Sequence, residues 1–165
     1  MSKPPAESSP ELLRPEAAKA AHTLFQVVTH SPEETITFGR ELARELQPPS
    51  LVLLQGELGS GKTTLVKGIV AGLGAAREEE VTSPSFTLVH EYGPAGRVYH
   101  VDLYRIEDGR ELSTLGLEDL VGQDATILVE WGEKLGESLP LSCFRIRMEY
   151  RANDERGITV ERVEA

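Results

Sequence analysis

The sequence predicts a single α/β domain of three layers, built around a sheet with both parallel and antiparallel strands. Two continuous apolar runs, residues 51–55 (LVLLQ) and 125–130 (ATILVE), are typical of central strands covered on both faces. A glycine-rich loop and an amphipathic pattern over residues 62–74 follow the first run and predict a helix. Alternating segments elsewhere predict hairpins. Helices packed on both faces of such a sheet give three layers.

Length, charge and cysteine content restrict the class of protein. The 165 residues suffice for one domain with a core and are short for two. Hydrophobic residues make up 39% and charged residues 27%, which is typical of a globular chain. The formal net charge of -10 disfavours direct binding to a nucleic-acid backbone. Cys143 is the single cysteine, which excludes an internal disulfide and a multi-cysteine metal site, and we expect a small strand residue there.

The termini and the hydropathy bear on location. No segment of the sequence has the ~20 apolar residues of a membrane span, and the N-terminus lacks an apolar signal core. With the single cysteine, this favours a cytoplasmic protein with no membrane partner. Residues 1–24 are rich in Pro, Ser, Ala and Glu, so we expect a flexible extension, with a short helix in 15–25 as an option. The folded domain is predicted to span residues 25–165.

The first predicted helix begins after residue 31. Ser31 is a suitable N-cap, Pro32 suits the first turn, and Glu34 completes a capping box. Apolar residues at a spacing of four then mark one face of the helix, and two prolines end it: Phe38, Leu42 and Leu46, followed by Pro48 and Pro49.

Two hairpins complete the expected sheet. Segment 86–92 and segment 97–106 are predicted to be antiparallel strands joined by the turn sequence GPAG. Residues 107–123 are more polar, and glycines divide them into short helical pieces. The C-terminal sequences CFRIRMEY and GITVERVEA alternate and flank the polar loop 151–156, so we expect a hairpin at the edge of the sheet.

Residues 56–63, GELGSGKT, match the phosphate-loop pattern G-x-x-x-x-G-K-[ST]. The glycines let several backbone N–H groups point inward, and the positive end of the next helix adds attraction for an anion. A strand before and a helix after are the required context, so the sequence predicts a P-loop NTPase-like domain. No N-K-x-D tetrad for guanine is evident, which favours ATP and ADP. The expected phosphate-binding residues are Gly59, Ser60, Gly61, Lys62, Thr63 and Thr64, with Lys62 on the phosphates and Thr63 on Mg²⁺.

Two carboxylates are candidates to complete the site. Glu130 ends the second apolar run, where a buried strand delivers its side chain to the carboxyl edge of the sheet; the alternative is a solvated strand end. Asp102 shares one strand face with His100 by alternation; the alternative is an ordinary strand-edge acid. We expect Glu130 to orient or activate water and to lie close to Mg²⁺, and Asp102 to hold the metal's water shell. Lys62, Asp102 and Glu130 are then the catalytic set, and Thr63 and Glu130 the metal ligands. A structural hydrogen bond is the favoured role for His100.

Two further features lie beside these candidates. Trp131, the single tryptophan, suits a position near the nucleotide, a partner surface or the core. Residues 82–86 (TSPSF) are rich in hydroxyls and suit either a loop that senses phosphate or a simple turn before a strand.

Five segments, in this order, resemble the bacterial TsaE family: GELGSGKTTLVKG, TSPSFTLVHEY, YHVDLYR, LGLEDL and LVEW. These proteins are small ATPases of tRNA threonylcarbamoyladenosine biosynthesis, and the likeness covers roughly residues 31–150. The phosphate loop alone is shared by many families, whereas DLYR and VEW together with SPSFTLV are more specific. Ser85 stands where the family usually has Thr, and Gly132 where it often has Pro.

The resemblance implies a role that the residues alone do not show. It implies a weak Mg²⁺-dependent ATPase that binds TsaD-like and TsaB-like proteins and supports threonylcarbamoylation of adenosine 37 in tRNAs that read ANN codons. The TsaD-like partner would carry out the transfer, so no direct tRNA binding is expected. The implied site adds Trp131 to the residues above, with 82–86 as a switch loop. Ser31 and the loop 151–156 are expected near the adenine.

Two other functions stay open. A small kinase has the same loop, but it needs additional cationic groups, and the basic residues between the loop and Glu130 form no tight cluster in the sequence: Lys67, Arg77, Arg97, Arg105 and Arg110. A nucleotide-gated binding module would keep the loop and Thr63 without depending on Glu130.

Overall fold

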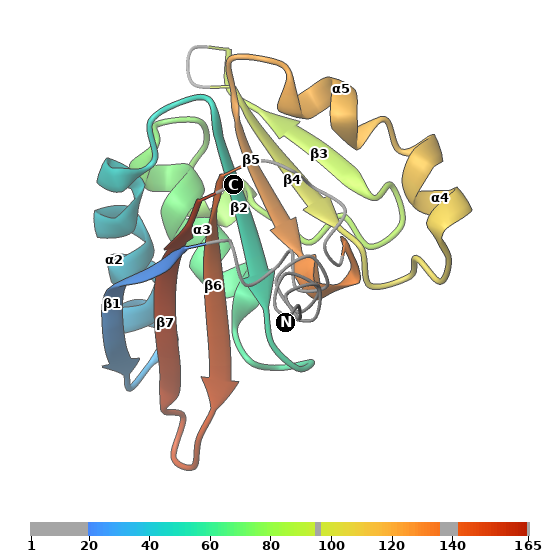
Figure 1. The fold of residues 1–165 in the computed structure, drawn as a ribbon. Helices are drawn as coiled ribbons and strands as arrows, with labels where there is room; N and C mark the ends of the chain where they lie inside the picture. The colour runs from blue at the N-terminus through green and yellow to red at the C-terminus, as the bar shows by residue number, and fades with distance from the viewer. Residues whose placement is uncertain (1–19, 95–96, 136–141, 165) are drawn as a thin grey trace, which may run out of the picture.

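The computed structural model describes residues 20–94, 97–135 and 142–164 and confirms the predicted three-layer α/β domain (Figure 1). Within the described residues, one sheet of seven strands has the order β1-β7-β6-β2-β5-β4-β3. The strands are β1 (Ala21–Thr29), β2 (Ser50–Gln55), β3 (Val89–Tyr92), β4 (Val98–Asp102), β5 (Thr126–Glu130), β6 (Cys143–Tyr150) and β7 (Arg156–Val163). The α-helices are α2 (Pro32–Leu42), α3 (Lys62–Gly72), α4 (Gly109–Thr114) and α5 (Leu117–Val121), and the short 3-10 turns are η2 (Ala43–Glu45), η3 (Glu78–Glu80) and η4 (Gly132–Leu135).

The sheet is mixed, as expected. β2 pairs in parallel with β5 and β6, and β4 pairs in parallel with β5, whereas the β3–β4, β6–β7 and β1–β7 pairs are antiparallel. The predicted C-terminal hairpin exists, but the prediction that it lies at the sheet edge is wrong. β6 joins the centre of the sheet through β2, and β1 covers the outer side of β7.

The N-terminal edge strand lies partly inside the segment predicted to be an extension. β1 begins at Ala21, which pairs with Val163 of β7, so the expected boundary at residue 24 falls within a strand. The optional helix over 15–25 is wrong for residues 21–25, because alternate side chains of β1, Phe25 and Val27, pack against the core. Residues 1–19 lie outside the described part of the chain.

Helices α2 and α3 cover one face of the sheet, and glycines let them approach closely. A Cβ added to Gly68 would lie 2.1 Å from the carbonyl oxygen of Ile36, and one on Gly72 would lie 2.8 Å from that of Arg40. Gly68 lies against Ile36 and Gly72 against Arg40, so residue numbers increase in the same direction along both helices and the helices are parallel. As predicted, Ser31 caps α2, with its Oγ accepting from the backbone N–H of Glu34 at 3.1 Å. The Glu34 carboxylate reaches back one residue further than expected, to the N–H of His30.

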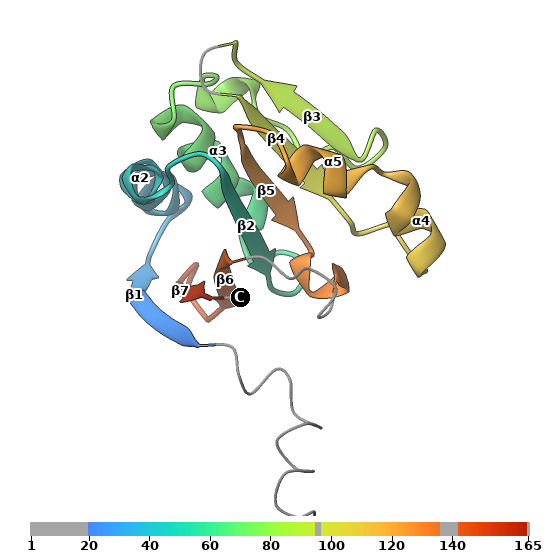
Figure 2. The same ribbon diagram turned by 45° about the horizontal axis from the view of Figure 1, so that its top comes forward.

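Helices α4 and α5 lie on the opposite face, over β3, β4 and β5 (Figure 2). Side chains of β2 alternate between the two faces of the sheet. Val52 and Leu54 pack in the core on the α3 side, and Leu51 and Leu53 pack in the core on the α4 and α5 side. Cys143 begins β6 and packs half-buried against this second cluster, in agreement with a small strand residue.

The first predicted hairpin is shorter than expected. β3 starts at Val89, not at residue 86, because residues 85–88 form a turn in which the N–H of Leu88 donates to the carbonyl of Pro84. Leu88 has a φ of 70°, which ends extended structure on that side, and Phe86 is 83% exposed. Among the described helices, none combines the length and apolar character that crossing a membrane requires.

Candidate nucleotide-binding site

The phosphate loop connects β2 to α3 with the backbone that the glycines predict. Gly56, Gly59 and Gly61 have φ angles of 152°, 84° and 105°, and Gly61 is the N-cap of α3. A Cβ on Gly56 would lie 2.5 Å from the carbonyl oxygen of Met148 in β6, so this position tolerates no side chain. The loop therefore presents its N–H groups and the start of α3 at the carboxyl edge of the parallel strands, where an anion is stabilised.

Lys62 folds back onto the loop. Its Nζ donates to the carbonyls of Gly56 at 2.5 Å and Glu57 at 3.0 Å, and it lies 4.0 Å from the centre of the Trp131 ring. The residue is 5% exposed, and this burial lowers the pKa of Lys62, an effect that the charge of Glu130 and other nearby acids partly offsets. A buried ammonium group whose partners are neutral carbonyls is well suited to bind an incoming phosphate.

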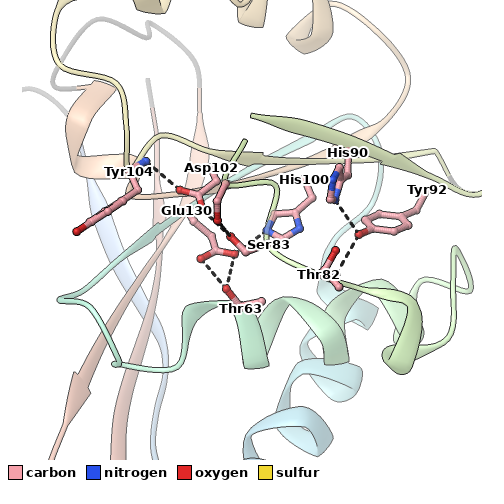
Figure 3. A network of polar contacts seen from close by, with 10 residues as sticks. Thr63, Thr82, Ser83, His90, Tyr92, His100, Asp102, Tyr104 and Glu130 are labelled. Atoms are coloured by element: carbon pink, nitrogen blue, oxygen red, sulfur yellow. Dashed lines mark hydrogen bonds and ion pairs between the residues drawn. The ribbon is translucent and has the colours of Figure 1, made fainter. Parts of the chain in front are cut away.

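The two predicted carboxylates lie side by side. Asp102 ends β4 and Glu130 ends β5, and the parallel register places them opposite one another. Both oxygens of Glu130 lie 2.9 Å from the Thr63 hydroxyl, and Oε2 also lies 2.6 Å from Nε2 of His100 (Figure 3). Glu130 is only 3% exposed, so the alternative of a solvated strand end is wrong. The adjacency arises because parallel strands end at the same edge.

Asp102 holds the segment 82–86 against the site. Its Oδ2 accepts from Ser83 Oγ at 2.5 Å, and its Oδ1 accepts from the N–H of Tyr104 at 2.9 Å. The N–H of Thr82 donates to the Tyr92 hydroxyl, which also contacts His90, so β3 holds the other side of this loop (Figure 3). The loop 82–86 is thus connected to a site carboxylate through a single hydroxyl.

The donor set fits Mg²⁺ bound together with phosphates. Among the described residues, no group of three or more His, Cys, Asp or Glu side chains is arranged as a metal site of its own. Mg²⁺ is usually held by one or two carboxylates plus a substrate's phosphate oxygens and waters. The hydroxyl of Thr63 and the carboxylate of Glu130, with Asp102 beside them, supply oxygen atoms of that kind.

One surface pocket gathers most of the predicted residues. It is lined by Gly59, Gly61, Lys62, Thr63, Thr64, Asp102, Glu130 and Trp131, together with Leu58, Ser83, Ser85, Tyr104, Arg105 and Arg156. Ser60 is buried inside the loop, where its N–H donates to the carbonyl of Glu57. Trp131 is half-buried over Lys62 and stacks with Tyr104 at a ring-centre distance of 5.1 Å.

The loop 151–156 reaches this pocket through Arg156, whereas Ser31 is not among the residues that line it. Within the described residues, the Ser31 side chain caps α2, and α2 starts at the same end as α3. Nε2 of His30 lies 3.6 Å from Glu155 Oε2, which connects the start of α2 to the loop. Both positions remain predictions for adenine contacts.

Two arginines of the pocket were not predicted as site residues. Arg105 lies over the Phe86 ring at 4.5 Å and Arg156 over the Tyr150 ring at 4.4 Å, and neither has an ion pair within the described residues. The motif DLYR is a weak signal for Arg105, and no local pattern points to Arg156, which β7 brings to the loop from a distant part of the chain. Of the basic residues considered between the loop and Glu130, only Arg105 lines the pocket, and the second arginine comes from outside that segment.

The fold and this pocket define a P-loop NTPase-like α/β domain. A family model described as "Threonylcarbamoyl adenosine biosynthesis protein TsaE" matches residues 29–158. The chain belongs to the TsaE family, which confirms the resemblance seen in the sequence and places the chain in a family of threonylcarbamoyladenosine biosynthesis.

Individual relatives agree with this assignment. The chain is 37% identical over 136 residues to the tRNA threonylcarbamoyladenosine biosynthesis protein TsaE of Treponema pallidum, an alignment covering 82% of this chain and 99% of that protein. It is 39% identical to the Bacillus subtilis protein of the same description, covering 79% of this chain and 81% of that one. A crystal structure of YdiB from Bacillus subtilis superposes with a TM-score of 0.69 at 32% identity, covering 87% of both chains.

Proposed function

We propose that this protein binds ATP with Mg²⁺, hydrolyses it slowly, and supports a TsaB–TsaD complex in threonylcarbamoylation of adenosine 37 in tRNAs that read ANN codons. The observation that carries the proposal is the contact between Thr63, at the start of α3, and Glu130, at the end of β5. It joins the phosphate loop to a buried carboxylate. Family membership supplies the pathway, because the relatives are described as proteins of tRNA threonylcarbamoyladenosine biosynthesis.

Binding requires two side chains to exchange partners. Lys62 would leave the carbonyls of Gly56 and Glu57 for oxygens of the β- and γ-phosphates, a change from neutral to charged acceptors. The Thr63 hydroxyl would turn from Glu130 toward Mg²⁺, with Glu130 close to the same ion. The ion supplies charge neutralisation for the phosphate oxygens.

In this proposal, Glu130 acts on the attacking water. With Thr63 turned away, its carboxylate would accept a hydrogen bond from a water molecule in line with the γ-phosphate and take the water's proton as the new O–P bond forms and the bond to ADP breaks. Asp102, one strand away, would orient further water near the ion. Arg105 and Arg156 border the same pocket and would offset negative charge on the phosphates.

The surface around the pocket supports docking of a partner protein. Six large apolar or aromatic side chains are exposed in the described chain, and four of them border the phosphate loop or its pocket: Leu58, Phe86, Tyr104 and Tyr150. Exposed apolar groups gathered at one place are typical of interaction sites. The net charge of -10 fits docking on a protein while the partner holds the tRNA, in the cytoplasm, and no direct tRNA contact is proposed.

The test is ATP hydrolysis by the protein alone and with the TsaB–TsaD pair from the same organism. We expect slow hydrolysis alone, a clear rise with the pair, and a loss of about 100-fold or more in Glu130→Ala, since a positioned base contributes 10²–10⁴-fold. Glu118→Ala, an exposed carboxylate on α5, is the matched control and should behave as wild type.

Each alternative has its own outcome in this test. If Glu130→Ala still binds ATP and supports tRNA modification at the normal rate, the protein is a nucleotide-gated binding module. If the pair neither binds nor changes the rate, while a small acceptor takes the γ-phosphoryl group, the protein is a kinase. The arginines now found at the pocket keep that second alternative worth testing.

A further inference from the structure

His100 is buried at the centre of the site and is not used by the proposed chemistry. It lies in the middle of β4 with none of its surface exposed, and its Nε2 is 2.6 Å from Oε2 of Glu130. Its Nδ1 is buried and has no hydrogen-bond partner within the described residues. The only polar contact shown for this imidazole is therefore the carboxylate of Glu130.

The geometry fixes the direction of that hydrogen bond. A carboxylate oxygen accepts, so Nε2 carries the proton and donates it to Oε2. The two strands hold the pair at fixed register, since His100 and Glu130 both belong to the parallel β4–β5 ladder. A donor that is itself locked by packing on a neighbouring strand restricts the rotation of the carboxylate.

Among the described residues, two side chains donate to the Glu130 carboxylate, Thr63 and His100. When nucleotide and Mg²⁺ bind, the proposed function requires the Thr63 hydroxyl to leave the carboxylate. Of the hydrogen bonds shown for its carboxylate, only the one from His100 then remains. A carboxylate left without that donor would rotate and would hold neither the ion nor the water in one place.

We propose that His100 is the positioning residue of the site: its Nε2–H holds the Glu130 carboxylate in place after Thr63 turns to the metal. This inference rests on the proposed function and deepens it. Groups that orient metal ligands commonly contribute 10–100-fold in metal affinity or activity. A side chain that only filled space would contribute to folding, not to the metal dependence of nucleotide binding.

The test compares two amides that differ in where they place the donor. His100→Gln puts an N–H near the position of Nε2, whereas His100→Asn puts it near Nδ1, out of reach of Glu130. Trp131, the single tryptophan, lies over Lys62, so we expect its fluorescence to change when nucleotide binds. One ATP titration in EDTA gives the affinity without metal, and titrations at a range of Mg²⁺ concentrations give the Mg²⁺ requirement. The kcat and KM of ATP hydrolysis are measured for the same variants.

We expect His100→Asn to require at least about tenfold more Mg²⁺ than wild type for Mg²⁺-dependent ATP binding, and to have a lower kcat. Its affinity for ATP without metal and its KM should stay within about twofold of wild type. His100→Gln should recover most of both losses. Equal behaviour of the two variants, or a normal Mg²⁺ requirement in His100→Asn, would overturn the inference. His22→Asn, at an exposed position of the edge strand β1, is the control and should leave the Mg²⁺ requirement unchanged.

A second measurement does not depend on the variants folding. In wild-type protein with ¹⁵N-labelled histidine, the Nε2–H signal of His100 should keep its hydrogen-bonded shift when a non-hydrolysable ATP analogue and Mg²⁺ are added. Loss of that signature would show that the ring releases Glu130, contrary to the inference. If wild-type protein binds no nucleotide at all, the proposed function fails together with the inference; if binding and the Glu130 dependence hold but His100→Asn is normal, the inference alone fails.

Discussion

The helices on the two faces of the sheet differ in how deeply they pack. α3 buries six of its eleven residues, whereas α4, on the other face, has six residues and buries none. The phosphate loop is continuous with α3, so its position is fixed by the densest part of the core. The opposite face carries the segments that follow Asp102, in short helices with few buried contacts. Segments of that kind belong to the low-stability end of a protein, from which parts that respond to ligands are drawn.

Truncating one apolar side chain on each face should give the largest stability difference. Ile69 of α3 is fully buried, so Ile69→Ala should lower the free energy of unfolding by about 2–5 kcal/mol. Leu112 of α4 is half-buried, so Leu112→Ala should cost about 1 kcal/mol or less. Urea unfolding of both variants measures the contrast, and equal losses would show that the two faces are equally rigid.

Adding a methyl group to one glycine on each face should give the next largest difference. A Cβ on Gly68 would meet the Ile36 carbonyl at 2.1 Å, so Gly68→Ala should force α2 and α3 apart and cost about 1–3 kcal/mol. Gly109, at the start of α4, has nothing within 4 Å, so Gly109→Ala should cost nothing. Thermal unfolding should show a drop for Gly68→Ala, at about 2–4 °C per kcal/mol, and no drop for Gly109→Ala.

The smallest expected effect concerns pH and the site lysine. Burial lowers the pKa of Lys62 in the folded protein below its ordinary value of 10.5. Between the folded-state pKa and that ordinary value, Lys62 holds its proton in the unfolded chain and loses it in the folded one. Stability contributed by this group therefore rises with pH across that window. Lys62→Met should remove this part of the rise when unfolding free energies are compared from pH 8 upward. An identical pH slope in both proteins would contradict the burial of a charged Lys62.

The parts that the sequence predicted correctly depend on local rules. The cap at Ser31, the strand at 51–55, the glycine-rich loop and the helix after it each follow from residues close together in the chain, and the structure has them. Segment 86–92 shows the limit of such rules. Its pattern fits a strand from residue 86, but the turn at 85–88 and the bond from Ser83 to Asp102 draw its first residues to the site.

Long-range pairing decided the rest. Arg156 reaches the pocket because β7 lies beside β6 and β6 lies beside the loop, and β1 forms the edge because it pairs with the C-terminal strand. No local pattern states which distant strand becomes a neighbour.

Residues close together in the chain were enough to predict the class of fold, the phosphate loop and Asp102 and Glu130 as candidate carboxylates, because glycine conformation, apolar runs and motif spacing act over a few residues. The tertiary packing was needed to show that Glu130 accepts from both Thr63 and His100 and that Asp102 accepts from Ser83. It also brings to the pocket two arginines that have no ion pair within the described residues. The hydrogen bonds among these contacts join residues from 19 to 67 positions apart, and the packing of strands and helices, not local preference, brings them within hydrogen-bonding distance.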